Sequence, residues 1–222
     1  MPGGIGIFGG TFNPIHFGHL RAAEEVREAQ GLDEIRLVPA ALPPHKEPAG
    51  LVAAAHRLRM VELAIAGVPG FRVSSIELER PGPSYSIDTL RAVAAEAGPA
   101  ARVVFVVGID AFRELHTWRE YAAIFGLCDV VVLTRPPWPE RLAHEDIPLA
   151  ARDAFWYDST SESFRHQSGH VLSLQRIPGL DISAVRIRTC VASRRSIRFL
   201  VPPAVEAYIA EHGLYRKGDG PR

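Results

Sequence analysis

The sequence contains only two cysteines, Cys128 and Cys190, among its 222 residues. This number is too small for the disulfide framework of a small secreted domain, and the two positions lack the spacing of a cysteine metal site. Cys128 lies in an apolar stretch, where we expect a small buried hydrophobe. A disulfide between the two residues stays open as an alternative. The low cysteine content is typical of a protein of the reducing cytosol.

An excess of one charge is also absent, because 25 lysines and arginines balance 25 aspartates and glutamates. Net charge therefore gives no indication of a nucleic-acid or anionic-membrane partner, and any anion site must arise from local clustering. No run approaches the ~20 apolar residues that cross a bilayer. The first ten residues lack the basic and apolar regions of a signal peptide. We expect a cytoplasmic protein with no nucleic-acid partner and no membrane partner.

Apolar strands and amphipathic helices alternate along the chain, and 47% of its residues are hydrophobic, as in a soluble globular protein. Strands are predicted at 5–8, 34–38, within 71–78, and at 102–107, 129–133 and 171–174. Helices are predicted at 18–30, 52–66, 86–97, 118–125, 183–192 and 203–212. This alternation predicts an α/β fold, a doubly wound parallel sheet with helices on both faces. We expect a single domain over 1–216, with an irregular excursion on the sheet edge at 135–170, C-terminal helices at 180–216 and a disordered tail at 217–222.

The stretch GIFGGTFNPIHFGHL, residues 6–20, carries the strongest functional signal. Gly9 and Gly10 follow the first strand, and glycines at that point let the backbone approach a ligand at the carboxyl edge of the sheet. His16 and His19 stand three residues apart at the entrance of a helix that begins near Gly18. Both rings can therefore reach one spot, beside the positive end of the helix dipole.

Other interpretations of this stretch exist. The glycines can form an ordinary turn while the histidines cap or pack, and a His-x-x-His pair can bind a metal, although no third ligand is evident nearby. Gly4, Gly6 and Gly9 also match G-x-G-x-x-G, the pattern of a dehydrogenase cofactor site, but the turn comes at Gly9 and Gly10, so this match is discounted. Two histidines beside a Gly-Gly turn favour a nucleotide site.

Residues 9–19, GGTFNPIHFGH, resemble the GGTF(D/N)PxHxGH signature of the nucleotidyltransferase superfamily. Further segments follow in one order: PPHK at 43–46, PSYSIDTL at 83–90, VGID at 107–110, TW at 117–118, RP at 135–136, ISAVRIR at 182–188 and VEAYIAEHGLY at 205–215. Together they resemble bacterial nicotinate-nucleotide adenylyltransferases over nearly all of 4–216. The resemblance implies a Rossmann-like fold and transfer of the adenylyl group of ATP to nicotinate mononucleotide, which gives nicotinate adenine dinucleotide and pyrophosphate in NAD biosynthesis.

The resemblance also implies a set of site residues. The ATP site is expected to comprise Gly9, Gly10, Thr11, Phe12, His16, His19, Gly108, Asp110, Arg135, Ser183 and Arg188. The acceptor site is expected to comprise Lys46, Tyr85, Ser86, Thr89, Trp118 and Arg119, with backbone amides near Ser86 and Arg119 on the nicotinate carboxylate. His16, His19, Lys46 and Arg188 are the expected catalytic residues. Mg²⁺ is expected to arrive with ATP and to need no dedicated protein ligands.

Each of these side chains also has an ordinary structural interpretation. Lys46 suits a phosphate but can be an exposed lysine. Asp110 can accept ribose hydroxyls or cap a helix. Trp118 can stack on a pyridine ring or pack in the core. Arg188 can be a surface residue, and Ser183 an N-cap.

Three residues depart from the family pattern: Ala40 stands where asparagine is common, Val185 where threonine is usual and Arg119 where tyrosine is common. These departures concern substrate preference and rate rather than the fold. The same chemistry on nicotinamide mononucleotide, phosphopantetheine or a sugar or alcohol phosphate stays open. A nucleotide-binding regulator without turnover is the alternative from another class. The oligomeric state is open, a homo-oligomer included.

Overall fold

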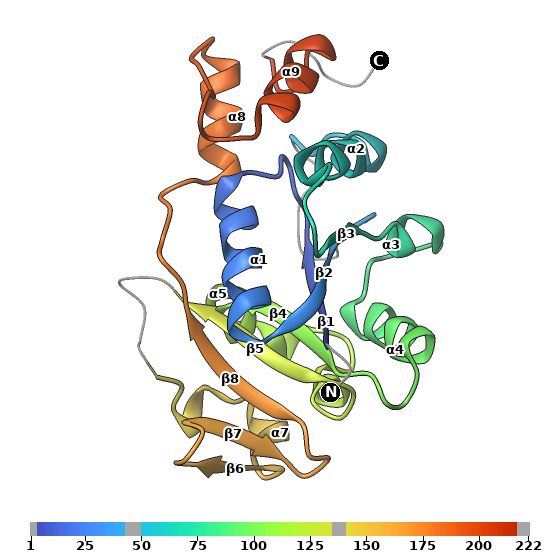
Figure 1. Cartoon of the computed structure of the whole chain (residues 1–222), viewed down its shortest axis with the longest axis vertical. Helices are drawn as coiled ribbons and strands as arrows, with labels where there is room; N and C mark the ends of the chain where they lie inside the picture. The colour runs from blue at the N-terminus through green and yellow to red at the C-terminus, as the bar shows by residue number, and fades with distance from the viewer. Residues whose placement is uncertain (1–3, 43–49, 135–140, 217–222) are drawn as a thin grey trace.

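The computed structural model describes residues 4–42, 50–134 and 141–216, and within them it contains one eight-stranded sheet. The strands are β1 (Gly4–Gly10), β2 (Leu32–Pro39), β3 (Phe71–Val73), β4 (Val103–Gly108), β5 (Asp129–Thr134), β6 (Phe155–Asp158), β7 (Ser163–His166) and β8 (Val171–Arg176). Their order is β3-β2-β1-β4-β5-β8-β7-β6 (Figure 1). Six strands from β3 to β8 pair in parallel, whereas β7 and β6 are antiparallel. The doubly wound α/β sheet predicted from the sequence is confirmed.

Helices connect the parallel strands. They are α1 (Phe17–Ala29), α2 (Ala54–Ile65), α3 (Ile76–Glu79), α4 (Ser86–Ala97), α5 (Ile109–Arg113), α6 (Tyr121–Ile124), α7 (Leu149–Arg152), α8 (Ala184–Ala192) and α9 (Pro203–Glu211), with 3₁₀ turns at Leu115–Thr117 and His144–Asp146. α8 and α9 stand beyond the carboxyl ends of β1 and β2, next to the start of α1 (Figure 1). This arrangement brings the C-terminal helices to the edge of the sheet where a ligand is expected.

Both faces of the central strands are buried, which explains their unbroken apolar sequences. Along β4, Phe105 and Val107 pack into a core shared with α4, α5 and β8. Val104 and Val106 point the other way, into a core shared with α1, α2, α8 and α9. Successive side chains of a strand alternate between faces, so each central strand supplies two cores.

The stretch 135–170, expected as an irregular excursion on the sheet edge, is described from residue 141 on and is more regular than expected. It contains the hairpin of β6 and β7, which extends the sheet at its edge. Asp158 closes the hairpin: its carboxylate accepts hydrogen bonds from the Thr160 amide at 3.0 Å, the Ser161 hydroxyl at 2.9 Å and Arg165 Nε at 2.9 Å. These bonds, that from Arg165 foremost, lower the pKa of Asp158 to about 2. Strands of four residues are too short for a recognisable alternation of apolar and polar residues.

The helix predicted at 118–125 is also shorter than expected. A 3₁₀ turn ends at Thr117, Trp118 has an extended backbone, and α6 begins only at Tyr121. Glu120 breaks the continuity because its φ is +48°. The interruption leaves Trp118 on a connection rather than inside a helix.

Both cysteines, Cys128 and Cys190, are free and buried, so the alternative of a disulfide between them is wrong. Burial raises the pKa of the Cys128 thiol to about 12, which fits the expected small buried hydrophobe. Among the described residues, no helix is both long and apolar enough to cross a membrane.

Candidate active site

Three adjoining cavities open along the carboxyl ends of β1 and β4. The aromatic cavity, about 320 Å³, is lined by side chains that include Phe8, Tyr85 and Trp118. The arginine cavity, about 370 Å³, contains His19 and Arg188. The histidine cavity, about 340 Å³, contains His16, His19, Asp110 and Ser183. Phe8 lines all three, and Gly9, Gly10 and Thr11 line the first two, so the end of β1 is a wall that the aromatic and arginine cavities share.

The turn expected at Gly9 and Gly10 begins only after them, because both are the last residues of β1, and they serve different purposes there. A Cβ on Gly10 would lie 2.8 Å from the Phe12 ring, so this glycine is needed for internal packing. A Cβ on Gly9 would meet nothing within 4 Å, because the position opens into the cavities. The lack of a side chain at Gly9 therefore leaves room for a ligand, whereas the lack of a side chain at Gly10 leaves room for Phe12. Phe12 is buried and lines the arginine cavity together with its neighbours Thr11 and Asn13.

His16 and His19 lie together at the start of α1, as their spacing predicts. Their rings stack, with centroids 3.6 Å apart and planes inclined by 21°. His16 is the N-cap of α1, and its carbonyl accepts hydrogen bonds from the amides of His19 at 2.9 Å and Leu20 at 3.2 Å. A Cβ on Gly18 would lie 3.0 Å from His16 Nδ1, so Gly18 makes room for the ring. Both imidazoles face the cleft, and neither is sealed in the core.

Arg188 lies on α8 and reaches across to the loop after β1. Its Nη1 donates a 2.9 Å hydrogen bond to the carbonyl oxygen of Asn13. The side chain is half-buried and lines the arginine cavity with His19, so the alternative of a plain surface arginine is wrong. Arg188 and His19, which are distant in the sequence, thus meet at one cavity.

The N-termini of two helices point at the same place. Gly18 at the start of α1 lines the histidine cavity, together with Ser183 and Ala184 at the start of α8. Ser183 is the N-cap of α8 and accepts a 3.2 Å hydrogen bond from the Arg186 amide, as its structural alternative predicts. Positive ends of two helix dipoles favour an anion here.

Asp110 and Gly108 close the histidine cavity from β4. Gly108 is the N-cap of α5 and Asp110 its second residue, so the interpretation of Asp110 as the helix cap is wrong. The Asp110 carboxylate is exposed at the cavity wall. It is therefore available to accept hydrogen bonds from hydroxyl groups.

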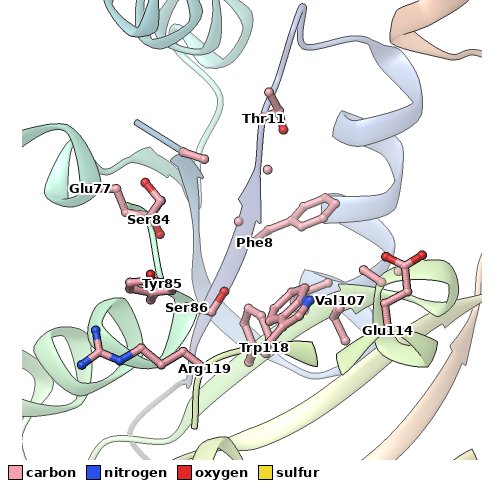
Figure 2. A pocket seen from close by; sticks show the side chains of 17 residues that line it. Phe8, Thr11, Glu77, Ser84, Tyr85, Ser86, Val107, Glu114, Trp118 and Arg119 are labelled. Carbon is pink, nitrogen blue, oxygen red and sulfur yellow. The ribbon is translucent and has the colours of Figure 1, made fainter. Parts of the chain in front are cut away.

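The aromatic cavity has a flat apolar wall and a polar end (Figure 2). Trp118 packs edge-on against Phe105, with centroids 6.4 Å apart, and still lines the cavity, so it contributes to the core and to the site. Tyr85 and Ser86 lie across from Trp118, where α4 begins. The Arg119 guanidinium lies over the Tyr85 ring, 4.9 Å from its centroid, and points away from Trp118 (Figure 2).

Thr89 is buried beneath this wall rather than exposed to the cavity. Its hydroxyl donates a 2.7 Å hydrogen bond to Glu77 Oε1 and accepts one from Arg80 Nη2 at 3.2 Å. Glu77, in contrast, does line the aromatic cavity. Thr89, one helical turn after Tyr85, therefore stabilises the start of α4 from the side away from the cavity.

Two expected residues, Lys46 and Arg135, lie outside the described residues. Of the departures from the family pattern, Ala40 and Arg119 line the aromatic cavity, and Val185 lines the arginine cavity. All three face the cleft, so their side chains alter its surface directly.

The sequence analysis missed three residues that organise the cleft from behind. Asn13 Nδ2 donates to the Gly50 carbonyl at 2.8 Å, and its Oδ1 accepts the Tyr215 hydroxyl at 2.9 Å. Arg57 is 1% exposed and donates to three backbone carbonyls. A signal for Arg57 exists in the sequence, since it precedes the buried Met60 and Val61 by three and four residues on one helical face.

Known proteins resemble the chain over nearly its whole length. The family model described as cytidylyltransferase-like matches residues 7–190. A probable nicotinate-nucleotide adenylyltransferase of Geobacter sp. (strain M21) is 49% identical over 211 residues, which are 95% of this chain and 97% of that protein. A second, from Syntrophotalea carbinolica, is 47% identical over 96% of this chain and 97% of its own length.

Solved structures agree on the fold. The nicotinic acid mononucleotide adenylyltransferase of Plasmodium falciparum, solved with NaAD, superposes with a TM-score of 0.69 at 18% identity and covers 96% of this chain and 97% of its own. A putative nicotinate-nucleotide adenylyltransferase of Vibrio parahaemolyticus gives a TM-score of 0.64 and covers 97% of this chain and 96% of its own. With the paired histidines at the entrance of α1 and the sequence identity of the relatives, the chain belongs to the nicotinate-nucleotide adenylyltransferase family of cytidylyltransferase-like nucleotidyltransferases.

Proposed function

We propose that this nucleotidyltransferase transfers the adenylyl group of ATP to nicotinate mononucleotide, giving nicotinate adenine dinucleotide and pyrophosphate in NAD biosynthesis. The observation that carries the proposal is the adjacency of two kinds of cavity on either side of the end of β1. Donors for a polyphosphate gather at His16, His19 and Arg188, and an aromatic slot with Trp118 begins on the other side of Gly9. The chain's relatives carry the same name.

In the proposed reaction, an oxygen of the 5′-phosphate of the mononucleotide attacks the α-phosphorus of ATP in line. A phosphorus–oxygen bond forms to this oxygen, and the bond from the α-phosphorus to the bridging oxygen breaks and releases pyrophosphate. The nucleophile is already an anion, so the protein needs no general base. Its work is to align two polyanions and to stabilise charge as it develops on the phosphate oxygens.

The proposed ATP subsite spans the arginine and histidine cavities. Arg188 and the two imidazoles supply donors to phosphate oxygens, and the starts of α1 and α8 add their dipoles. Asp110 is placed to accept hydrogen bonds from the ribose hydroxyls. Lys46 and Arg135 keep the roles in phosphate and ATP binding that the family resemblance implies.

The proposed acceptor subsite is the aromatic cavity. The indole of Trp118 offers a flat surface for the pyridine ring, and Tyr85 and Ser86 border it at the N-terminus of α4. A helix N-terminus favours the nicotinate carboxylate over the neutral amide of nicotinamide. Thr89 acts in this proposal through the start of α4 and not through direct contact.

Mg²⁺ is proposed to enter on the triphosphate and to supply charge neutralisation there. The donor set fits this arrangement, because Asp110 is the only carboxylate among the described residues of the arginine and histidine cavities. Hard divalent cations of this kind keep several waters when they bind nucleotides. The cytoplasm is the proposed compartment, and the two free thiols support it.

The decisive experiment measures pyrophosphate release from ATP with nicotinate mononucleotide and, separately, with nicotinamide mononucleotide. The wild type should prefer the acid, and His19→Ala should lower kcat by at least about 100-fold. His144→Ala is the matched control, because His144 is exposed in the 3₁₀ turn far along the chain from α1. A near-normal kcat in His19→Ala would reject the catalytic assignment. Preference for another phosphate acceptor would change the substrate, and tight ATP binding without turnover on any acceptor would favour a regulator.

A further inference from the structure

Arg57 is a buried cation that none of the steps above uses. It lies on α2 and is 1% exposed. In the described part of the chain, no carboxylate lies within 4.0 Å of its guanidinium. Burial lowers the pKa of Arg57 from its ordinary value, and Tyr215 and Glu77 only partly oppose this effect. An arginine still stays protonated, so the protein keeps a full positive charge behind the cleft.

The guanidinium is held by backbone oxygens at three points on two connections: Thr11 after β1, and Ala41 and Val52 near the two ends of the connection from β2 to α2. Its Nη1 donates to the Thr11 carbonyl at 2.8 Å, its Nη2 to the Ala41 carbonyl at 3.0 Å and its Nε to the Val52 carbonyl at 3.1 Å. A buried charge that lost these bonds would be strongly destabilising, whereas an apolar side chain of similar size is often tolerated at such a position. Stability alone therefore does not require an arginine here.

These three points of the backbone border the candidate active site. Thr11 belongs to the turn shared by the aromatic and arginine cavities. Ala40, the neighbour of Ala41, lines the aromatic cavity, and Leu51, the neighbour of Val52, lines the arginine cavity. Arg57 itself is enclosed behind them. One side chain thus joins the wall between the proposed ATP and acceptor subsites to the outer walls of both.

We propose that Arg57 is a positioning residue for adenylyl transfer: it fixes the backbone at Thr11 relative to both ends of the β2–α2 connection, at Ala41 and Val52, and so sets the alignment of the two reacting phosphates. This inference rests on the proposed function. The planar guanidinium suits the task because its donors diverge in fixed directions, whereas lysine presents three donors from one nitrogen. Lysine keeps the charge but cannot reach all three carbonyls.

The test compares Arg57→Lys and Arg57→Gln with two control variants on the same helix. Arg59→Lys changes an exposed arginine that pairs with Glu62 at 2.8 Å. Met60→Ala opens a cavity in the core and lowers stability, and it removes none of the three hydrogen bonds of Arg57. For each variant, kcat, both KM values and Tm are measured, together with the Kd of a non-hydrolysable ATP analogue by calorimetry.

Arg57→Lys and Arg57→Gln should lower kcat by about 10- to 100-fold, since small misplacements of reacting groups have effects of this size. Both should also weaken binding of the ATP analogue by at least about fivefold, because the turn at Thr11 is no longer pre-organised. Arg59→Lys should match the wild type. Met60→Ala should have a lower Tm than the wild type. Its kcat should be unchanged at a temperature where circular dichroism shows that the variant is folded.

The proposal is overturned if Arg57→Lys keeps kcat and analogue binding within about twofold of the wild type, well below the effect of misplacement. It is also overturned if Met60→Ala, with the same decrease in Tm as the Arg57 variants, shows the same decrease in kcat. The same holds if neither Arg57 variant folds, because the role of Arg57 is then to stabilise the fold. Absence of turnover by the wild type would reject the proposed function instead, and the binding measurement would still decide the role of Arg57.

Discussion

The contact between the C-terminal segment and the loop after β1 predicts a stability difference that changes sign with pH. Tyr215 donates its hydroxyl to Asn13 Oδ1 at 2.9 Å. Tyr215→Phe removes this hydrogen bond and little else. Asn13 Oδ1 then keeps only the longer contact from the Val52 amide at 3.4 Å. At pH 8 the variant should lose about 1 kcal/mol of unfolding free energy, the net contribution of one such bond.

The order should reverse in alkali. Burial raises the pKa of Tyr215 above its ordinary value, and this effect outweighs the attraction of the phenolate to Arg188 and Arg57. Stability from a group with a raised folded pKa is complete below the unfolded pKa, about 10 for tyrosine, and is lost as the pH rises towards the folded pKa. By linkage, the unfolding free energy of the wild type falls relative to that of the phenylalanine variant. The fall is about 1 kcal/mol by pH ~10.6 and about 2 kcal/mol by pH ~11.5. The two proteins should therefore be equally stable near the first pH, and the variant more stable at the second.

Urea unfolding followed by far-UV circular dichroism measures this difference at pH values of about 8, 10.6 and 11.5. Tyr157→Phe is the matched control, since Tyr157 is 49% exposed on the edge strand β6. Its effect should stay within about 0.5 kcal/mol at pH 8. A Tyr215→Phe difference that keeps the same sign and size from pH 8 to pH 11.5 would show that the hydroxyl is not held in the buried, protonated state described here.

Two further results are expected. Gly10→Ala should lower the unfolding free energy by about 1–3 kcal/mol in urea, because its Cβ would lie 2.8 Å from the Phe12 ring. Gly9→Ala should keep normal stability and raise the KM for ATP, because its Cβ would project into the cleft. Equal stability of the two variants would contradict this assignment. Cys128 and Cys190 are buried and free, so a thiol reagent should label neither in the native protein and both after unfolding in the absence of reductant. Fewer than two reactive thiols in the unfolded chain would indicate a disulfide.

The sequence predicted the parallel part of the sheet well because its strands are buried on both faces. Residues 102–107 have no polar interruption after Arg102, and the structure places β4 at the centre with a core on each side. The β6–β7 hairpin was missed for the opposite reason. Trp156 and Tyr157 are half-exposed on an edge strand, so their sequence does not show the alternation that reveals a half-buried strand.

The placement of site residues could be predicted where it follows from local sequence. The spacing of His16 and His19 places both rings at one helix entrance, and a single helix turn suffices to establish this. Arg57 could not be assigned in the same way, because its three partners are backbone carbonyls at sequence distances of 5, 16 and 46 residues. A backbone carbonyl carries no residue signature, so only the tertiary structure reveals such a contact.

Two of the departures from the family pattern, Ala40 and Val185, lie on the walls of the aromatic and arginine cavities. Ala40 and Val185 each remove a side-chain hydrogen-bonding group from a cavity wall, yet the donors that remain belong to the backbone at helix N-termini and to Arg188. Backbone donors are fixed by the fold, and the fold around them is held by buried contacts such as those of Arg57. We therefore expect the residues at positions 40 and 185 to be tolerated as long as the backbone behind the cleft keeps its position, and we expect substitution of the buried Arg57 to lower the rate more than substitution at either of them.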